Sequence, residues 1–554
     1  MLHRLFMIIV GFVTTLLISV FASYPAFGSK GVFGFVAEIN VAAPSDMCAT
    51  FVTIHGYKCH EYEVTTDDGY ILSVKRIPQG RVGGSGHNRQ PVLLQHGILV
   101  DGATWVMNSA EQSLAMILAD SGFDVWIANT RGTRYSLRHL NLHSYNPDYW
   151  NWSWDDLVVH DLPTFVNLVY EQTGHKAHYV GHSLGTLIAL ASFSEGRQID
   201  KIKSAALLSP IAYLSHMTTA LGVITARSFL GEITTIFGLA EFNPTSAPVS
   251  IFVKALCAQR GINCYDFLTA LTGKNCCLNA STVDLFLKNE PQPTSTKNFV
   301  HLAQTVRDGI LRKYDYGSFI NNLAHYGEVK PPQYNLANIP RDLPLFLSYG
   351  GQDALSSTKD VETLLDHLKN HDVGKLHVQY VKDFAHADFI LGTTAKDIVF
   401  NQIKNAMAAQ HVVGGSQGWD ESADFKSWAS GQTFKVGDTL VFRYNPGLHS
   451  VVELEGDSSY KSCDISSTVN SMSAGNDVVK LNKPGTRYFA CGTAGHCDQG
   501  MKLKIKTVTG SAPSNQADSS TPSSSSAASH CFSTTFFTFI AAILTVQMAL
   551  VFLL

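Results

Sequence analysis

The sequence predicts two domains, an α/β domain built on a mostly parallel sheet and a small all-β sandwich behind it. With 554 residues the chain is longer than one hydrophobic core usually spans. Over residues 45–408, short apolar β-rich runs alternate with helical patterns, as in parallel strands joined by crossover helices. From 410 to 507, short alternating runs separated by turn residues indicate the sandwich. The net charge of −4 shows no basic excess, so we expect no nucleic-acid partner.

Residues 1–28 predict entry into the secretory pathway. They open with His3 and Arg4, continue through an apolar run and reach the small residues Ala26 and Gly28, which is the layout of a signal peptide. An N-terminal anchor helix is the alternative interpretation.

The C-terminal end predicts a membrane tether. Residues 508–530 are rich in Ser, Ala and Pro and cannot build a core, and residues 531–554 form an apolar tail. This order is typical of a GPI-attachment signal, cut here near Ser524 to Ala527. A spanning helix is the alternative, because residues 536–554 would extend about 28 Å. Either tether predicts a location at the extracellular face of the plasma membrane or in the cell wall.

The ten cysteines are expected mostly to pair in an oxidising compartment. Cys48 and Cys59 lie close together in the sequence. A second cluster of four allows three pairings, and the sequence does not choose among them, although a bond between its two adjacent members is not expected. That cluster comprises Cys257, Cys264, Cys276 and Cys277.

Cys463 and Cys497 would make a further pair, which leaves Cys491 free for chemistry and Cys531 in the tail. The same secretory route fits two N-glycosylation sequons, which begin at Asn151 and Asn279.

The stretch Gly181-His182-Ser183-Leu184-Gly185 matches the pattern G-x-S-x-G between a predicted strand and a predicted helix. The glycines allow a sharp turn from strand to helix, so that the hydroxyl of Ser183 protrudes into a cleft. We therefore predict that Ser183 is a nucleophile.

A nucleophilic serine needs a base and an acid that orients the base. Asp353 follows the predicted strand at 343–349, and His386 follows the strand at 376–381, so both stand on loops after later strands in the order that G-x-S-x-G enzymes use. Rival candidates are Asp360, Asp383 and Asp388 for the acid and His371 and His377 for the base.

Two backbone N–H groups are expected to hold the oxyanion that forms during acyl transfer. One belongs to Leu184, the residue after the nucleophile, and the other to Ile98 in the loop after the early strand. Gly97 permits the close approach of that loop.

These residues resemble the acid lipases, which include gastric, lysosomal and plant triacylglycerol lipases. The similarity covers nearly all of 45–408 and is carried by "LLQHGILVDGATWV", "YVGHSLGT", "LFLSYGGQDALSS" and "AHADFILG". The resemblance implies an α/β hydrolase fold with a cap insertion at about 210–335, no cofactor in this domain, and hydrolysis of triacylglycerol-like lipid esters. It also implies Ser183, Asp353 and His386 as a triad. Leu184 departs from animal members, which carry Gln there, but the expected donor is a backbone N–H.

The second domain contains a set of metal ligands. His449 follows one predicted strand, and Cys491, His496 and Met501 come from one loop with the spacing Cys-x4-His-x4-Met. Two imidazoles, a thiolate and a weak axial thioether form the blue-copper set. Zinc is the main rival, although zinc sites usually pair their cysteines as C-x2–4-C, which is absent here.

Residues 411–507 resemble the phytocyanins, through "VVGGSQGW", "FKVGDTLVF" and "YFACGTAGHCDQGMK". The resemblance implies a cupredoxin-like sandwich with type 1 copper on His449, Cys491, His496 and Met501, as in the uclacyanin-like branch. It also implies a Cys463–Cys497 disulfide and, for an electron-transfer domain, a small redox partner.

Three hypotheses follow for the whole chain. The first is a secreted, membrane-tethered lipid-ester hydrolase with a copper domain. The second is a copper-binding electron-transfer surface protein whose lipase domain is vestigial. The third is a merged reading of two neighbouring genes, one for each domain.

Overall fold

The computed structural model describes residues 46–81, 89–219, 240–243, 268–269, 271–407, 410–436, 438–466 and 468–508. The predicted signal peptide, the apolar tail and the cysteines 257, 264 and 531 lie outside these residues, as does most of the first half of the predicted cap. Across the described ranges, no helix combines the length and apolar character needed to cross a membrane.

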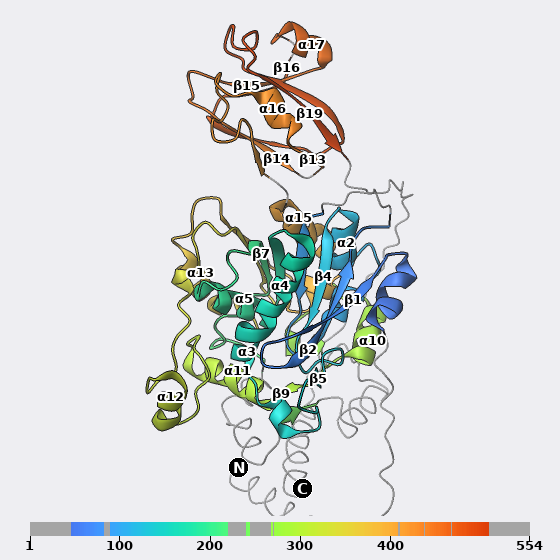
Figure 1. Ribbon diagram of the computed structural model, residues 1–554, viewed down its shortest axis with the longest axis vertical. Helices are drawn as coiled ribbons and strands as arrows, with labels where there is room; N and C mark the ends of the chain where they lie inside the picture. The colour runs from blue at the N-terminus through green and yellow to red at the C-terminus, as the bar shows by residue number, and fades with distance from the viewer. Residues whose placement is uncertain are drawn as a thin grey trace, which may run out of the picture. The chain divides into compact units, whose positions relative to one another are not determined.

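Nine described strands form one sheet in the order β1-β2-β4-β3-β6-β7-β10-β11, with β5 beside β2 (Figure 1). The neighbours from β4 through β11 are parallel, whereas β1 and β2 run antiparallel to their neighbours. This arrangement confirms the predicted mostly parallel sheet. The strands are β1 (His60–Thr65), β2 (Tyr70–Ile77), β3 (Pro91–Gln95), β4 (Asp124–Asn129), β5 (Arg138–His139), β6 (Ala177–His182), β7 (Ile202–Leu208), β10 (Leu345–Gly350) and β11 (Leu376–Val381).

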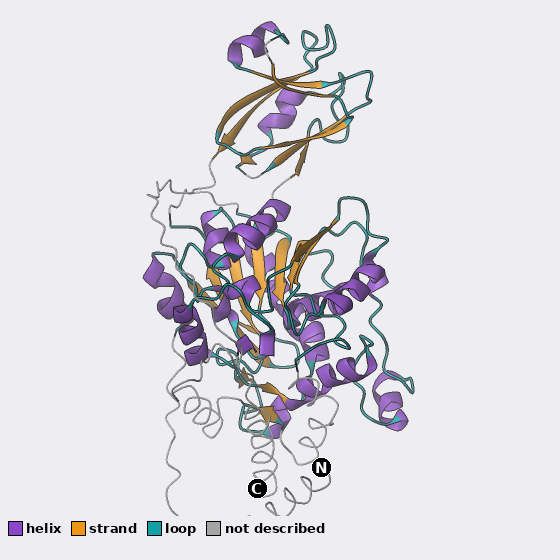
Figure 2. Cartoon of the chain, turned by 180° about the vertical axis from the view of Figure 1, so that it is seen from behind, coloured by secondary structure: helices purple, strands orange, loops and turns teal. Residues whose placement is uncertain are grey.

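Helices cover both faces of this sheet because successive strand residues point to opposite sides. In β3, Val92 and Leu94 pack into one buried cluster and Leu93 into the other. The cluster around Leu93 includes residues of α4 and α5, and the cluster around Val92 includes residues of α2 and α15 (Figures 1 and 2). These helices are α2 (Leu114–Asp120), α4 (Leu162–Thr173), α5 (Leu184–Ser194) and α15 (Asn401–Met407), with α3 (Trp154–Asp156), α13 (Thr358–Leu368) and α14 (Asp388–Leu391) on connections.

Short helical turns connect several of these elements. They are η1 (Cys48–Val52), η2 (Thr53–His55), η3 (Gly102–Trp105), η4 (Pro147–Trp150), η5 (Leu157–Asp161), η6 (Leu336–Asn338) and η7 (Lys396–Phe400). The described residues of the predicted cap form α10 (Ala280–Asn289), α11 (Thr296–Asp308), α12 (Phe319–Tyr326) and the strand pair β8 (Glu241–Phe242) and β9 (Thr294–Ser295).

The second domain is a β-sandwich, as the sequence predicted. One sheet has the order β12-β14-β17 and the other β13-β19-β18-β15-β16. Trp419, Phe442 and Phe489 are fully buried in its core. The elements are β12 (Gln410–Val412), α16 (Phe425–Ser430), β13 (Phe434–Lys435), β14 (Thr439–Arg443), β15 (Val451–Leu454), α17 (Asp457–Ser462), β16 (Thr468–Met472), β17 (Asn476–Lys480), β18 (Gly485–Ala490) and β19 (Lys502–Val508).

Disulfides join Cys48 to Cys59 and Cys463 to Cys497, and Cys491 is free. A third disulfide joins the adjacent Cys276 and Cys277, so the expectation that these two would not pair was wrong. That expectation considered only the usual Cα separation of disulfides, about 4.4–6.8 Å. The two backbone N–H groups both donate to the Asp388 carboxylate at 3.1 Å, which holds this dipeptide in a turn.

Candidate active site and metal centre

Ser183 lies in a strained turn between β6 and α5. Its φ of 54° and ψ of −119° fall in a region that residues with a side chain rarely adopt, at a cost of about 1–3 kcal/mol. The close packing beneath the turn requires glycine at 185, because a Cβ there would lie 2.6 Å from the carbonyl oxygen of Gln95 in β3. The Ser183 N–H donates to the Leu208 carbonyl at the end of β7, at 3.1 Å. The turn is therefore fixed by both neighbouring strands.

Asp353 and His386 meet directly. Asp353 follows β10, and its Oδ1 accepts hydrogen bonds from the N–H groups of Leu355 and Ser356 at 2.9 and 2.8 Å. His386 follows β11, and its Nδ1 lies 3.0 Å from Asp353 Oδ2. Since a carboxylate accepts, the Nδ1–H donates, and the proton-accepting lone pair is left on Nε2.

His386 is also held through its backbone. Its N–H donates to the Thr272 carbonyl at 3.1 Å, and the same carbonyl accepts the Ala354 N–H at 3.3 Å, so Thr272 links the acid and base loops. The His386 carbonyl accepts the Nε2–H of His182 at 3.0 Å. Burial keeps the pKa of His182 well below its usual range, so this imidazole is neutral. Neither Thr272 nor His182 was identified from sequence.

The structure places Ser183 beside this pair without a direct hydrogen bond to it. His182, which precedes Ser183, has its ring 4.8 Å from the ring of His386. Among the described residues, no hydrogen bond joins the Ser183 hydroxyl to His386. Catalytic hydrogen bonds of this kind are often long in ligand-free enzymes and tighten when substrate binds.

Ile98 and Leu184 line one small cavity, together with Trp152, Leu157 and Pro293. Leu184 is the first residue of α5, where backbone N–H groups have no partner inside the helix. Over the part of the chain that the structure describes, neither amide donates a hydrogen bond. Both predicted donors thus lie at the same cavity without a hydrogen-bond acceptor among the described residues.

The loop that carries Ile98 is held against Ser183. A Cβ at Gly97 would lie 2.9 Å from the Ser183 Cβ, so only glycine allows this approach. His96 stabilises the loop, because its Nδ1–H donates to the Gly97 carbonyl at 2.8 Å and its Nε2 accepts the Thr130 N–H at 3.1 Å. This role of His96 was not predicted from the sequence.

The rival acids and bases have other partners or lie exposed. The Asp388 carboxylate accepts the Ala385, Cys276 and Cys277 N–H groups. The Asp360 carboxylate lies 2.8 Å from His216 Nδ1 and accepts the Ser357 hydroxyl at 3.2 Å, while the Asp360 N–H donates to Ser357 Oγ at 3.3 Å. The remaining candidates do not contact the pair described above: the His371 Nε2–H donates to the Leu343 carbonyl, and Asp383 and His377 are exposed.

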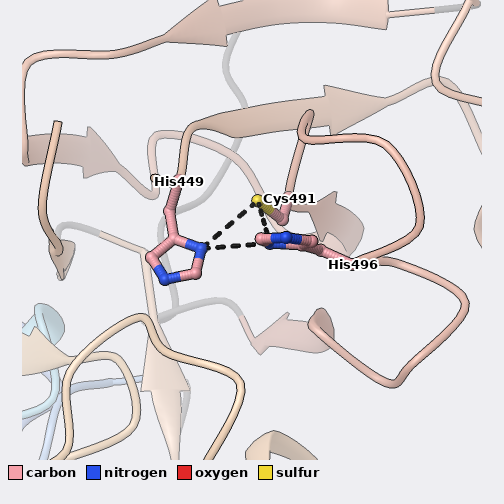
Figure 3. Close-up of side chains that lie close together, drawn as sticks. All are labelled: His449, Cys491 and His496. Atoms are coloured by element: carbon pink, nitrogen blue, oxygen red, sulfur yellow. Dashed lines mark hydrogen bonds between the residues drawn. The ribbon is translucent and has the colours of Figure 1, made fainter. Parts of the chain in front are cut away.

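Three predicted metal ligands converge in the sandwich domain. Figure 3 shows the ring nitrogens of His449 and His496 pointing toward the Cys491 sulfur. Cys491 Sγ lies 3.9 Å from His449 Nδ1 and 3.7 Å from His496 Nδ1, and the two Nδ1 atoms are 3.1 Å apart. Three ligands bound about 2.1 Å from one ion would lie about 3.6 Å from each other. The donors thus have the spacing that a metal ion needs.

Met501 closes the same loop. Its backbone carbonyl accepts the Cys491 N–H at 3.0 Å and its N–H donates to the His496 carbonyl at 3.0 Å. The Met501 side chain is buried in the core of the sandwich, and the neighbouring Cys497 ties the loop to Cys463. A soft donor set of two imidazoles, one thiolate and a nearby thioether suits copper.

Two acidic residues lie beside the outer edges of the two imidazoles that are predicted to bind the metal. Glu421 Oε1 lies 3.0 Å from His496 Nε2, and Asp420 Oδ2 lies 3.7 Å from His449 Nε2. A carboxylate at Nε2 favours the tautomer that keeps the Nδ1 lone pair free for a metal. Sequence reasoning missed both residues, although an acidic pair directly after the core Trp419 was a usable signal.

Comparisons with known proteins agree with the two folds described above. Residues 90–393 match the family model described as the alpha/beta hydrolase fold, and residues 48–109 match the partial alpha/beta-hydrolase lipase region. Triacylglycerol lipase 2 of Arabidopsis thaliana is 57% identical over 399 residues, covering 71% of this chain and 96% of that protein. Gastric triacylglycerol lipase of Rattus norvegicus is 34% identical over 390 residues, covering 69% of this chain and 96% of that protein.

The chain belongs to the alpha/beta-hydrolase lipase family. This assignment confirms the predicted similarity to triacylglycerol lipases and makes the protein a lipase-type ester hydrolase. The matched range 90–393 of this lipase contains Ile98, Ser183, Asp353 and His386.

The lipase carries a second family signature. Residues 419–501 match the model described as a plastocyanin-like domain, which confirms the predicted type of the C-terminal sandwich. Cucumber stellacyanin, whose structure contains Cu²⁺, is 32% identical over a match that covers 19% of this chain and 98% of stellacyanin, with a TM-score of 0.18.

Proposed function

We propose that this lipase cleaves triacylglycerol-like lipid esters with Ser183, His386 and Asp353. The observation that carries the proposal is the Asp353 carboxylate 3.0 Å from His386 Nδ1, next to a nucleophile turn with a φ of 54°. The Ser183 Oγ attacks the acyl carbonyl while His386 Nε2 takes its proton. The N–H groups of Ile98 and Leu184 bind the oxyanion.

The second half of the reaction releases the products. His386 gives its proton to the leaving alkoxide, so that the alcohol departs and the acyl group stays on Ser183. Water then attacks the acyl-enzyme with His386 as base, and the fatty acid leaves. Asp353 keeps the His386 ring oriented and stabilises its charged form throughout.

The substrate class rests on the relatives. Two relatives named above are triacylglycerol lipases. We propose an acyl ester of a lipid alcohol as substrate.

We further propose that His449, Cys491, His496 and Met501 hold a type 1 copper ion. Copper bound there would supply one-electron exchange with a small redox partner. The chain's own contribution is a buried thiol, two imidazoles and the loop that fixes them. The converging donor atoms support this proposal.

A reciprocal pair of variants tests both halves. Ser183→Ala should remove hydrolysis of p-nitrophenyl butyrate and leave the blue absorption of the copper-loaded protein unchanged. Cys491→Ser should remove the blue absorption and leave hydrolysis intact. If Ser183→Ala kept full hydrolysis, the triad would be withdrawn. A parent protein without hydrolysis would favour the copper-binding surface protein with a vestigial lipase domain.

We propose secretion through the signal peptide at 1–28 and a GPI tether near Ser524 to Ala527, with glycans at the exposed Asn151 and Asn279. Release of hydrolase activity from membranes by a phosphatidylinositol-specific phospholipase C would support the tether, and retention would favour a spanning tail.

The tryptic peptide from Asn405 to Lys426 crosses the domain junction. Its detection in tissue extract by mass spectrometry would exclude two separately encoded proteins.

A further inference from the structure

The loop that carries the Ile98 amide has an unusual backbone conformation. Leu99, the next residue, has a φ of 61°, which disfavours residues with a side chain. Such a conformation persists only where surrounding contacts hold it. The contacts come from residues 289–292 of the predicted cap, which begin at the last residue of α10 and are called the strap below.

The strap is bonded to the loop through the backbone. The Gln292 N–H donates to the Leu99 carbonyl at 2.8 Å. The Gln292 side chain is itself held, because its Oε1 accepts the Arg134 N–H at 3.1 Å and its Nε2 donates to the Asn289 carbonyl at 2.7 Å. One bond therefore restrains the residue directly after the proposed oxyanion donor.

A buried group of charged residues holds the other end of the loop. The side chains of Asp101 and Glu290 are both fully buried, and Arg134 is the guanidinium that they share. Arg134 Nε lies 2.7 Å from Asp101 Oδ2, and Arg134 Nη2 lies 3.9 Å from Glu290 Oε1. The Asp101 N–H points to Glu290 Oε1 at 3.4 Å. The strap thus grips the loop at Leu99 and at Asp101.

One guanidinium cannot balance two buried carboxylates. Burial and the neighbouring Asp101 carboxylate raise the pKa of Glu290 well above its usual range. Glu290 is therefore the neutral member of the group. Its contribution to the loop is an acceptor oxygen and a filled volume, and a neutral amide of the same shape could replace it.

We propose that Glu290, together with Arg134, is a positioning residue for the oxyanion loop, fixing the Ile98 amide toward the acyl carbonyl through Leu99 and Asp101. The inference rests on the proposed hydrolytic function of Ser183 and Ile98. A merely structural carboxyl would affect folding, whereas this one affects the transition state.

The experiment compares E290A with E290Q in the full-length protein. E290A should lower kcat for p-nitrophenyl butyrate about a hundredfold, near the low end for loss of one oxyanion donor, with little change in KM. E290Q should restore most of that loss, because it keeps the oxygen and the volume. An unchanged kcat in E290A, or an equal loss in E290Q, would overturn the proposal.

Two controls separate positioning from stability. Asp124→Asn removes a comparable carboxylate: Asp124 is buried at the start of β4 and lies 2.8 Å from Arg76 of β2. This variant should lower the melting temperature without lowering kcat. If E290A does not fold, Arg134→Lys decides, since it keeps the positive charge but loses the guanidinium fork between Asp101 and Glu290, and it should lower kcat with the fold retained. An unchanged kcat in that variant would overturn the proposal.

Labelling of the nucleophile by an alkyl phosphonate ester distinguishes failure of the inference from failure of the proposed function. The parent protein should be labelled at Ser183, and E290A should be labelled about a hundredfold more slowly, because the phosphonyl oxygen occupies the same amide site. Normal labelling in E290A overturns the strap's role and leaves the triad standing. Absence of label in the parent protein overturns the triad itself.

Discussion

His386 in the hydrolase domain and His496 in the sandwich each present one ring nitrogen to a carboxylate at 3.0 Å. The two carboxylates have different surroundings: the Asp353 side chain is fully buried, whereas Glu421 is 43% exposed. A buried carboxylate interacts more strongly because water does not screen it. The same contact should therefore matter far more at the hydrolase site than at the metal centre.

The two sites also differ in how they are assembled. The hydrolase residues stand on loops after β3, β6, β10 and β11, so the sheet brings them together from Ile98 to His386. Three of the four proposed metal ligands come from one loop, Cys491 to Met501, and one disulfide ties that loop to Cys463. The hydrolase site, which the sheet assembles, should therefore tolerate the loss of a single crosslink. The metal site, which is built mostly from one loop, should depend more strongly on its disulfide.

The largest expected effect is at Asp353. Asp353→Asn leaves the shape intact but removes the acceptor for His386 Nδ1–H and favours the wrong tautomer, so kcat should fall about 10⁴-fold. Ester hydrolysis at saturating substrate measures it. Asp360→Asn is the matched control, because Asp360 pairs with His216 at 2.8 Å and should change kcat less than tenfold. If Asp353→Asn lowered kcat only slightly, burial of the carboxylate would not make the Asp353–His386 contact stronger than the exposed Glu421–His496 contact.

The second prediction concerns the disulfides. The Cys463–Cys497 bond closes a loop with a sequence separation of 34, and the Cys48–Cys59 bond one of 11. Replacing both cysteines by serine should cost about 4 kcal/mol of unfolding free energy for the longer loop and about 3 kcal/mol for the shorter. Calorimetry that resolves the two domain transitions measures the costs. If the loss of Cys48–Cys59 lowered the unfolding free energy more than the loss of Cys463–Cys497, the metal site would not depend more on its disulfide than the hydrolase domain does.

The third prediction is a pH dependence in the hydrolase domain. Burial raises the pKa of Asp155 to about 7, although Tyr334 Oη–H and the Tyr314 N–H donate to it. Because the folded pKa exceeds the unfolded value, the folded state binds the extra proton, and the stability contributed by Asp155 is present at low pH and lost as pH rises through 7.

The unfolding free energy should therefore fall by at most about 2 kcal/mol between pH 5 and pH 7 because of this group. Asp155→Asn cannot titrate, so denaturant unfolding should show a smaller fall between the two pH values in this variant. An identical pH profile in the variant and the parent would assign the dependence to other groups.

The sequence predicted what depends on strand order and missed what depends on distant packing. Ser183, Asp353 and His386 follow particular strands, and that order could be read without coordinates. Glu290 could not be found, because its partner Asp101 is 189 positions away and the intervening residues carry no periodic signal that joins them. The Cys276–Cys277 bond was missed because the carboxylate that holds this dipeptide, Asp388, lies more than a hundred residues downstream.

The smallest expected effect returns to the exposed carboxylate. Glu421→Gln keeps an oxygen acceptor for the His496 Nε2–H but removes the charge, so copper affinity should fall about tenfold, the lower end for loss of a partner to a metal ligand. Competition with a chelator measures the affinity, and the reduction potential should shift with it. Asp420→Asn is the matched variant beside His449, because it keeps the side-chain length of aspartate. It should lower copper affinity less than Glu421→Gln, since Asp420 lies 3.7 Å from His449 whereas Glu421 lies 3.0 Å from His496. An effect of Glu421→Gln as large as that of Asp353→Asn would mean that water does not screen this contact, and that the two histidines are held equally despite the difference in burial.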